Sequence, residues 1–218
     1  MKKLAIFDLD GTLLDSLGDI AQCCNQTLQE LGLEPYPVDA YRQFVGSGVA
    51  ALIDRIFVNR EHTAETKEAF RVRYMELYNA VCAHGSTPFE GTIAMLTKLH
   101  ELGVKTAVAT NKPDHMCKMV LDDAFPGCID IAYGQRDDIA KKPAPDVVYR
   151  IMQDAGVTDK AEVVYVGDSD VDIFTGTNAG VDTVGVLWGM RPREELVGAG
   201  AKMLAETNEE LLEKICNL

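Results

Sequence analysis

The sequence predicts an α/β protein with a Rossmann-like, doubly wound parallel sheet and an all-helical domain inserted near the N-terminus. Two observations support this fold class. Short β-branched runs alternate with helical patterns from about residue 90 onward, whereas the segment after the first run shows helical periodicity only. Alternation of strands and helices is typical of βαβ units, which place helices on both faces of a parallel sheet.

The predicted strands are apolar or β-branched runs that stop at polar residues or glycine. They are residues 4–9, 104–110, 163–167 and 183–187. The predicted helices between them begin at a proline suited to a first turn or end at a glycine. They are residues 92–102, 113–124 and 145–155, and an acidic helix follows at residues 206–214.

The segment after the first strand contains no convincing strand pattern. Helices are predicted after a cap at Asp15 or Ser16, and at residues 38–45, 49–57 and 63–81. In the last of these we expect one side to carry Phe70, Tyr74, Leu77 and Val81. The predicted division is therefore an α/β core of residues 1–15 and 85–218, and a helical domain of residues 16–84.

Composition narrows the possible partners. The net charge of −13 argues against nucleic acid or an anionic membrane as the main partner, because a negative surface attracts neither. An anionic small molecule is still possible, since a metal ion can invert the sign locally. The six cysteines form no metal-binding pattern, and no apolar stretch is long enough for a bilayer. We expect a cytoplasmic monomer or homodimer with reduced thiols.

Polar residues follow the predicted strands at the ends where doubly wound sheets bind ligands. They are Asp8 and Asp10 after the first strand, Thr110 and Asn111 after the second, and Asp168, Asp170 and Asp172 after the third, with Lys142 before the helix at 145–155. Several carboxylates gathered in one crevice repel one another unless a cation compensates them. Oxygen ligands without histidine or cysteine favour Mg²⁺, especially where phosphate is also bound.

With a metal present, these residue types suit phosphoryl transfer. A carboxylate can attack phosphorus only if lysine, metal and hydrogen-bond donors neutralise the phosphoryl oxygens. Lys142, Thr110 and Asn111 are suitable donors, and the backbone N–H groups of Gly11 and Thr12 are expected near the phosphoryl group. A second carboxylate two residues from the nucleophile can protonate the leaving oxygen and later activate water.

These segments resemble the four ordered motifs of the haloacid dehalogenase superfamily. The motifs are Asp8-Leu9-Asp10-Gly11-Thr12, Thr110-Asn111, Lys142-Pro143 and Gly167-Asp168-Ser169-Asp170-Val171-Asp172. Within the superfamily the sequence is most similar to phosphoglycolate phosphatases and their capped relatives. The resemblance covers the core, whereas the helical insertion fits a cap domain in position and length only.

The resemblance implies a role for each matching residue. Asp8 would be the nucleophile that forms an aspartyl-phosphate, and Asp10 the general acid and base. Mg²⁺ would be held by Asp8, Asp168 and the backbone carbonyl of Asp10. Asp172 and Ser169 would support the metal site from outside its direct ligands, and Thr110, Asn111 and Lys142 would hold the phosphoryl group. Asp10 favours phosphoryl transfer, because the dehalogenases of the superfamily lack this second aspartate.

Substrate selection is expected to lie in the helical domain. Gly46-Ser47-Gly48 either faces the active site, where backbone N–H groups would bind a substrate carboxylate, or forms a plain interhelical turn. Hydrolysis of a small phosphorylated metabolite, with 2-phosphoglycolate as the lead candidate, is the preferred function. The alternatives are a mutase resembling β-phosphoglucomutase and a pyrophosphatase. The complete set of motif residues disfavours a purely regulatory protein.

Overall fold

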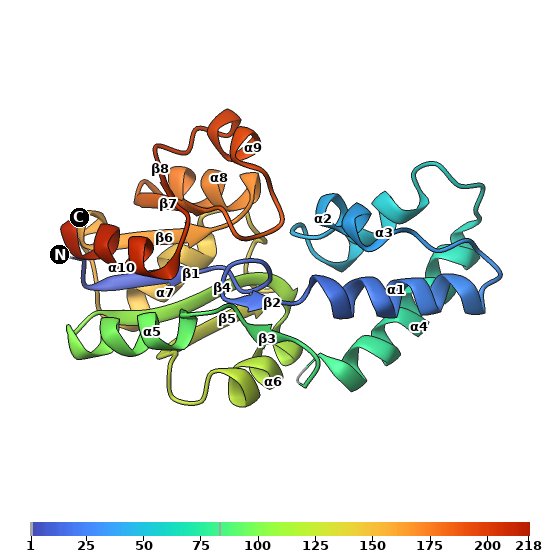
Figure 1. The fold of residues 1–218 in the computed structure, drawn as a ribbon, viewed down its shortest axis with the longest axis horizontal. Coiled ribbons are helices and arrows are strands. Elements are labelled where there is room, and N and C mark those ends of the chain that lie inside the picture. Colours follow the sequence, from blue (N-terminus) through green and yellow to red (C-terminus); the bar gives the residue numbers. More distant parts are fainter. Residues whose placement is uncertain (1, 83) are drawn as a thin grey trace.

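The computed structural model describes residues 2–82 and 84–218. A sheet covered by helices carries both ends of the chain, and a separate group of helices lies to one side (Figure 1). This group consists of α1 (Leu17–Glu30), the short 3-10 helix η1 (Val38–Ala40), α2 (Tyr41–Phe44), α3 (Val49–Phe57) and α4 (Ala64–Val81). We call it the helical insertion. The exact division at residues 15/16 and 84/85 stays a prediction, and Met1 and Ala83 lie outside the described residues.

The sheet is parallel throughout and has the strand order β5-β4-β1-β6-β7-β8. Its strands are β1 (Leu4–Phe7), β4 (Lys105–Pro113), β5 (Ile131–Gln135), β6 (Val163–Gly167), β7 (Asp182–Val186) and β8 (Met203–Ala205). The chain builds outward from β1 through β4 to β5, then returns to the other side of β1 and continues through β6 to β8. This reversal beside β1 opens a crevice at the carboxyl ends of the strands. The predicted α/β fold class is confirmed.

Successive side chains of β1 point to opposite faces of the sheet, and all four are fully buried. Leu4 and Ile6 belong to the apolar cluster formed with α7 (Asp146–Ala155) and α8 (Asp170–Ala179). Ala5 and Phe7 belong to the opposite cluster, formed with three other helices. These are α5 (Thr92–Glu101), α6 (Asp114–Ala124) and α10 (Asn208–Asn217). A strand covered on both faces reads as a continuous apolar run, which is why its sequence pattern is clear.

The elements that sequence patterns did not predict lie mainly at the edges of the sheet. β5 and β8 are the two outermost strands, and each has partly exposed residues and only one neighbouring strand. Their apolar patterns are correspondingly weak. Helix α8 was missed because Thr175, Gly176 and Thr177 are poor helix formers. The short helices η2 (Lys160–Glu162) and α9 (Arg193–Gly198) complete the core. No described helix is both long and apolar enough to cross a membrane.

Aromatic side chains form a row along α4 inside the helical insertion. Phe70, Tyr74 and Tyr78 are buried, and their rings stack in sequence with centroid separations of 6.2 and 5.5 Å. The expectation that Leu77 and Val81 share this face is wrong for Val81, which is exposed. The buried positions are spaced four residues apart throughout, so the row ends at Tyr78, next to the sheet.

Two chain segments connect the insertion to the core, and they lie side by side. β2 (Leu14–Asp15) enters the insertion and β3 (Thr87–Pro88) leaves it, and the two pair in antiparallel fashion. The hydroxyl of Ser86 also donates to the carboxylate of Asp19 at the start of α1. The insertion is therefore attached along one short line, close to the carboxyl end of β1.

The burial of β1 generates a stability prediction. Replacing Ile6 with alanine should lower the free energy of unfolding by about 2–5 kcal/mol, because the neighbouring helices cannot collapse fully into the space left behind. Val58→Ala is the control, since Val58 is 71% exposed and its truncation should cost less than about 0.5 kcal/mol. Urea unfolding of both variants measures the difference, and equal costs would contradict the packing described for β1.

Candidate active site

The residues that follow β1, β4 and β6 meet at one edge of the sheet. Phe7 pairs with Val108 of β4 and with Val166 of β6, so the polar residues beyond these positions become neighbours. A cavity of about 50 Å³ opens there, between the sheet and the helical insertion. From the core it is lined by Asp8, Asp10, Thr110, Asn111, Lys112 and Pro113, and from the insertion by Ile20, Val45, Gly46, Gly48, Val49, Leu52, Tyr74 and Tyr78.

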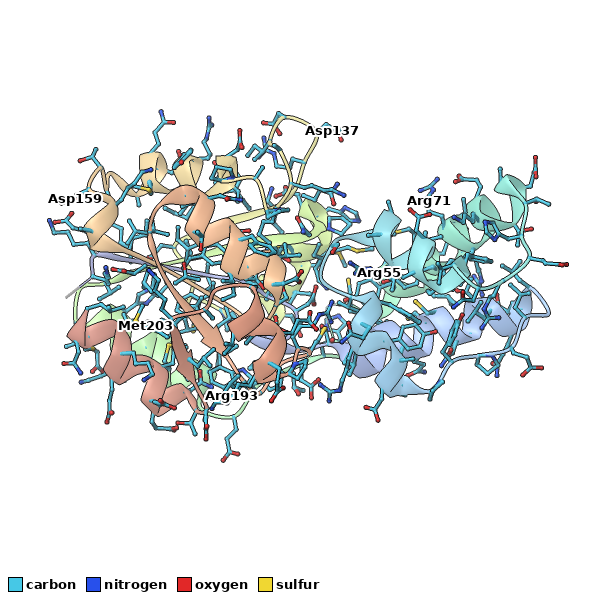
Figure 2. All side chains as sticks on the ribbon, turned by 90° about the horizontal axis from the view of Figure 1, so that it is seen from above. Arg55, Arg71, Asp137, Asp159, Arg193 and Met203 are labelled. Carbon is cyan, nitrogen blue, oxygen red and sulfur yellow. The ribbon has the colours of Figure 1, made fainter. Side chains whose placement is uncertain are left out.

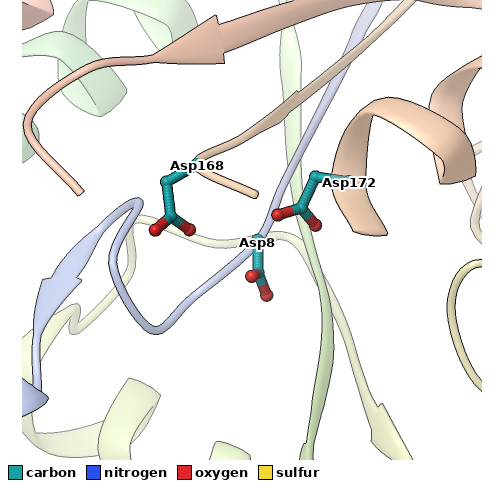
Figure 3. Close-up of side chains that lie close together, drawn as sticks. All are labelled: Asp8, Asp168 and Asp172. Carbon is teal, nitrogen blue, oxygen red and sulfur yellow. The ribbon is translucent and has the colours of Figure 1, made fainter. Parts of the chain in front are cut away.

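Three buried carboxyl groups gather beside this cavity. Asp8 directly follows β1, Asp168 directly follows β6, and Asp172 lies in the first turn of α8 (Figure 3). One oxygen of each lies within 4.8 Å of the others. The side chain of Lys142 is also buried, and its Nζ atom lies 2.9 Å from Asp8 Oδ1 and 2.8 Å from Asp172 Oδ1. Lys142 thus contacts two of the three carboxyl groups, and Asp168 forms no ion pair with it among the described residues.

The shortage of positive charge shifts the acidities of these groups. Burial, reinforced by the charge of Asp172, raises the pKa of Asp8 from 3.8 to about 8, although Lys142 opposes the shift. Burial and Asp172 likewise raise the pKa of Asp168 to about 7. Burial alone would lower the pKa of Lys142, but the charges of Asp172 and Asp8 raise it well above its usual value. Asp8 and Asp168 therefore take up protons near neutral pH, and a cation bound between them would displace these protons.

The three carboxyl groups differ in the number of hydrogen bonds that their oxygens accept. Asp172 accepts hydrogen bonds on Oδ1 from Lys142 and the Tyr165 hydroxyl, and on Oδ2 from the backbone N–H and hydroxyl of Ser169. Ser169 caps α8, so Asp172 is held by the helix start itself. Asp8 Oδ1 is buried and makes no hydrogen bond of acceptable geometry, despite its proximity to Lys142.

These differences bear on which residues could hold a metal. The oxygen-only donor set suits a hard cation such as Mg²⁺. Asp168 accepts from the Thr12 hydroxyl at 3.2 Å and from the backbone N–H of Met190 at 2.7 Å. These two bonds orient its carboxyl group beside Asp8. Asp172 already has four donors, which fits a supporting position better than direct ligation.

Asp10 lies apart from this cluster and has its own cation. Both carboxylate oxygens contact Nζ of Lys112, at 2.8 and 3.0 Å, and the same ammonium donates to the hydroxyl of Tyr78. Neither Lys112 nor Tyr78 was singled out from the sequence. The available signal was position: Lys112 directly follows Thr110 and Asn111 at the end of β4, and all three residues line the cavity.

The residues at the end of β4 use their side chains in different ways. The hydroxyl oxygen of Thr110 accepts the backbone N–H of Lys112 at 3.2 Å, which leaves its own proton free to donate into the cavity. Asn111 instead joins three segments. Its Oδ1 accepts the backbone N–H of Lys142 at 3.1 Å, and its Nδ2 donates to the carbonyl of Gly46 at 3.1 Å. Asn111 thereby connects the sheet to the loop between α2 and α3.

The loop at Gly46–Gly48 rests directly on the core. Gly46 and Gly48 line the cavity, whereas the Ser47 hydroxyl accepts a hydrogen bond from Arg55 of α3. Arg55 also donates to the carbonyls of Phe44 and Val45, so it holds the loop from within the insertion (Figure 2). Gly48 has a φ of +84°, and an added Cβ would lie 3.3 Å from the Asn111 carbonyl oxygen. Glycine is needed there both for conformation and for close approach.

The turn after Asp10 corrects one expectation from the sequence. The N–H groups of Gly11 and Thr12 do not face the cavity as free donors, because they bond to the carbonyls of Leu14 and Leu9, at 2.9 and 3.2 Å. Their contribution is spatial instead. An added Cβ on Gly11 would overlap with the carboxyl group of Asp168, so glycine allows the turn to pack against that group.

Known proteins match this chain over most of its length. A family model described as haloacid dehalogenase-like hydrolase matches residues 5–186. A phosphoglycolate phosphatase of Aquifex aeolicus is 36% identical over 188 residues, covering 86% of this chain and 85% of the relative. One from Vibrio parahaemolyticus is 31% identical, covering 98% and 96%. The crystal structure of a protein provisionally named phosphoglycolate phosphatase, from Lactobacillus delbrueckii subsp. bulgaricus, superposes with a TM-score of 0.91 at 31% identity, covering 99% of each chain.

The crowding of carboxyl groups predicts a pH-dependent stability effect. Because the pKa of Asp168 is raised to about 7, the folded protein binds a proton there that the unfolded chain releases above about pH 4, and stability falls as pH rises between these values. Asp168→Asn removes this penalty. In the presence of a chelator, its melting temperature should exceed that of the wild type by about 2–4 °C near pH 8, for roughly 1 kcal/mol, and by less near pH 5.

Exposed Asp122 on α6 provides the control, since Asp122→Asn should leave the melting temperature nearly unchanged at both pH values. The amide that Asp168→Asn introduces can keep both hydrogen-bond partners of the original carboxyl group, because the Thr12 hydroxyl can accept as well as donate. A variant that gains no stability at the higher pH would contradict the electrostatic account of the site.

Proposed function

This chain belongs to the haloacid dehalogenase-like hydrolases and is a phosphatase, and we propose that it hydrolyses a small phosphomonoester through an aspartyl-phosphate on Asp8. The observation that carries the proposal is the convergence of residues from separate strand ends on one cavity. Asp8, Asp10 and Thr110 line this cavity. Lys142 is not part of the lining but contacts Asp8. Their types match what phosphoryl transfer requires.

In the first step, a carboxylate oxygen of Asp8 bonds to phosphorus as the bond between phosphorus and the leaving oxygen breaks. Lys142 holds the nucleophile in place and offsets negative charge on the phosphoryl group. The free hydroxyl proton of Thr110 donates to a phosphoryl oxygen. Asn111 acts indirectly, since its side-chain bonds fix the backbone of Lys142 and the Gly46 loop.

Asp10 serves both half-reactions. It gives a proton to the leaving oxygen as the substrate alcohol departs, and it then removes a proton from the water that attacks the phosphorus of the aspartyl-phosphate. Phosphate leaves and the Asp8 carboxylate is restored. Its place in the cavity lining, two residues from Asp8, supports this dual role.

Mg²⁺ would be held by Asp8, Asp168 and the backbone carbonyl of Asp10, where it supplies positive charge to the phosphoryl oxygens. The close grouping of buried carboxyl oxygens and the raised pKa values of Asp8 and Asp168 support this assignment. Asp172 and Ser169 orient the surrounding groups. Asp172 binds Lys142, and Ser169 fixes Asp172 through its backbone and hydroxyl.

The cavity supports a small substrate, with 2-phosphoglycolate as the lead candidate. Its volume of about 50 Å³ corresponds to roughly four water molecules when each occupies about 10–15 Å³. This matches a leaving group of a few non-hydrogen atoms, such as glycolate, better than a hexose. The relatives from Aquifex aeolicus and Vibrio parahaemolyticus carry the name phosphoglycolate phosphatase. The small volume disfavours the sugar-phosphate mutase alternative, whereas pyrophosphate is as small as 2-phosphoglycolate and is separated from it only by the names of the relatives.

The nucleophile gives the primary test. Asp8→Asn should lower kcat for phosphate release from 2-phosphoglycolate with Mg²⁺ by at least about 10³-fold, because an amide cannot form the acyl phosphate. Asp122→Asn, an exposed change of the same type, should keep wild-type activity. Adding a chelator to the wild type should abolish turnover, and added Mg²⁺ should restore it. Near wild-type turnover by Asp8→Asn would rule out the mechanism.

The Gly46–Gly48 loop gives a test of substrate selection. Gly48→Ala should raise KM for 2-phosphoglycolate by roughly 10-fold, because the new methyl group pushes the loop away from Asn111. Gly32→Ala is a matched control: Gly32 also has a positive φ, of +72°, but an added Cβ meets nothing within 4 Å. A phosphate-release screen over phosphorylated metabolites, including sugar phosphates and pyrophosphate, completes the test. Equal losses on every substrate would exclude a role for the loop in selection.

A further inference from the structure

We propose that Lys112 is a positioning residue for Asp10, and that it makes the orientation of this carboxyl group depend on the helical insertion through Tyr78. The inference rests on the proposed function, since it requires Asp10 to act as the acid. It adds a residue that lies outside the four sequence motifs and assigns the insertion a part in the chemistry as well as in substrate selection.

The contacts of Lys112 place it between the two parts of the molecule. It comes from the end of β4 in the core, and its side chain is almost completely buried. Its Nζ atom lies 2.8 and 3.0 Å from the two oxygens of Asp10 and donates to the hydroxyl of Tyr78 from α4. It also lies 4.7 Å from the centre of the Tyr78 ring. An ammonium has three donors, and these partners take most of them.

Contact with both oxygens restrains rotation of the Asp10 carboxyl group. Without Lys112, Asp10 would have no other ion-pair partner among the described residues, and its side chain is only 13% exposed. A short side chain at the cavity wall could then turn among several orientations. Proton transfer to a leaving oxygen requires a defined hydrogen-bond geometry, so a mobile carboxyl group loses acid catalysis before it loses substrate binding.

Tyr78 is itself held firmly by the insertion. Its ring stacks on Tyr74 at 5.5 Å, and Tyr74 stacks on Phe70 at 6.2 Å. The row is buried from the middle of α4 to the cavity wall. When the insertion sits on the core as it does here, the Tyr78 hydroxyl fixes the Lys112 ammonium and Lys112 fixes Asp10. If the insertion moved away, Lys112 would lose one of its anchors. The carboxyl group of Asp10 is therefore fully positioned only when the helical insertion closes the cavity.

Lys112 differs in function from Lys142, although both are buried lysines in contact with an aspartate. Lys142 contacts Asp8 and Asp172, beside the reacting phosphorus, so its loss should affect every substrate. Lys112 contacts Asp10, which protonates the leaving oxygen in the proposed mechanism. Its loss should matter only when the leaving oxygen needs a proton.

The experiment compares two small substrates that differ in this need. The alkoxide that leaves 2-phosphoglycolate requires protonation, whereas the acetate that leaves acetyl phosphate does not. The measured quantity is kcat/KM, which reports steps up to the first phosphoryl transfer and excludes hydrolysis of the shared aspartyl-phosphate. Lys112→Met should lower kcat/KM for 2-phosphoglycolate by roughly 10- to 100-fold, and for acetyl phosphate by less than about threefold.

Three further variants make the result decisive. Tyr78→Phe keeps the stacked ring and removes only the hydroxyl, so it should give a smaller loss with the same preference, and it decides the matter if Lys112→Met folds poorly. Asp10→Asn should show the full selective loss. Lys98→Met, at an exposed lysine paired with Glu101 on α5, should change neither substrate.

The outcomes separate the two proposals. Selective loss in Asp10→Asn, but equal losses on both substrates in Lys112→Met and Tyr78→Phe, would overturn the role of Lys112 and leave the proposed function intact. Equal losses in Asp10→Asn would overturn the acid role of Asp10 and the present inference with it. Selective loss in Asp10→Asn, Lys112→Met and Tyr78→Phe, with unchanged KM for acetyl phosphate, would support both proposals.

Discussion

The structure depends on holding three buried carboxyl groups together at the carboxyl end of β1, where the buried ammonium of Lys142 contacts two of them. Asp8, Asp168 and Asp172 repel one another, and burial strengthens the repulsion, so the arrangement persists only because the surrounding fold over-determines it. Because β1 and β6 are neighbours in the sheet, the segments that follow these two strands lie side by side. The capped start of α8 fixes Asp172, and the tight turn at Gly11 allows close approach to Asp168. Raised pKa values of Asp8 and Asp168 are the consequence, and a bound cation would relieve the repulsion between these groups.

A second constraint is the set of contacts between the helical insertion and the core. The contacts are polar and directional: Asn111 donates to Gly46, buried Arg191 donates to the carbonyl of Val45, and Lys112 donates to Tyr78. Two of these three core residues neighbour Thr110 on β4. β4 thus carries both Thr110, which donates to the phosphoryl group in the proposed mechanism, and two residues that contact the insertion. Under that mechanism, closure of the cavity and assembly of the catalytic groups would be physically linked.

Strands that are buried in the structure were predicted from the sequence, and the more exposed strands were not. The central strands β1, β4 and β6 were found because both faces are covered and their residues form unbroken apolar runs. The edge strands β5 and β8 were not, because exposure on one side weakens the pattern. Sequence spacing also found the motif residues that follow the strands. It did not find Tyr78 or Arg191, whose roles arise from contacts between segments far apart in the chain.

The sequence by itself determined the fold class, the family resemblance and the set of acidic, hydroxyl and lysine side chains at the strand ends, because these follow from local patterns and motif order. Only the tertiary structure decided how those side chains divide their contacts. It showed that Asp172 is saturated by donors while an oxygen of Asp8 is not, and that Asn111 joins the core to the insertion. It also paired Asp10 with Lys112. Such pairings depend on distances between segments, which no local pattern encodes.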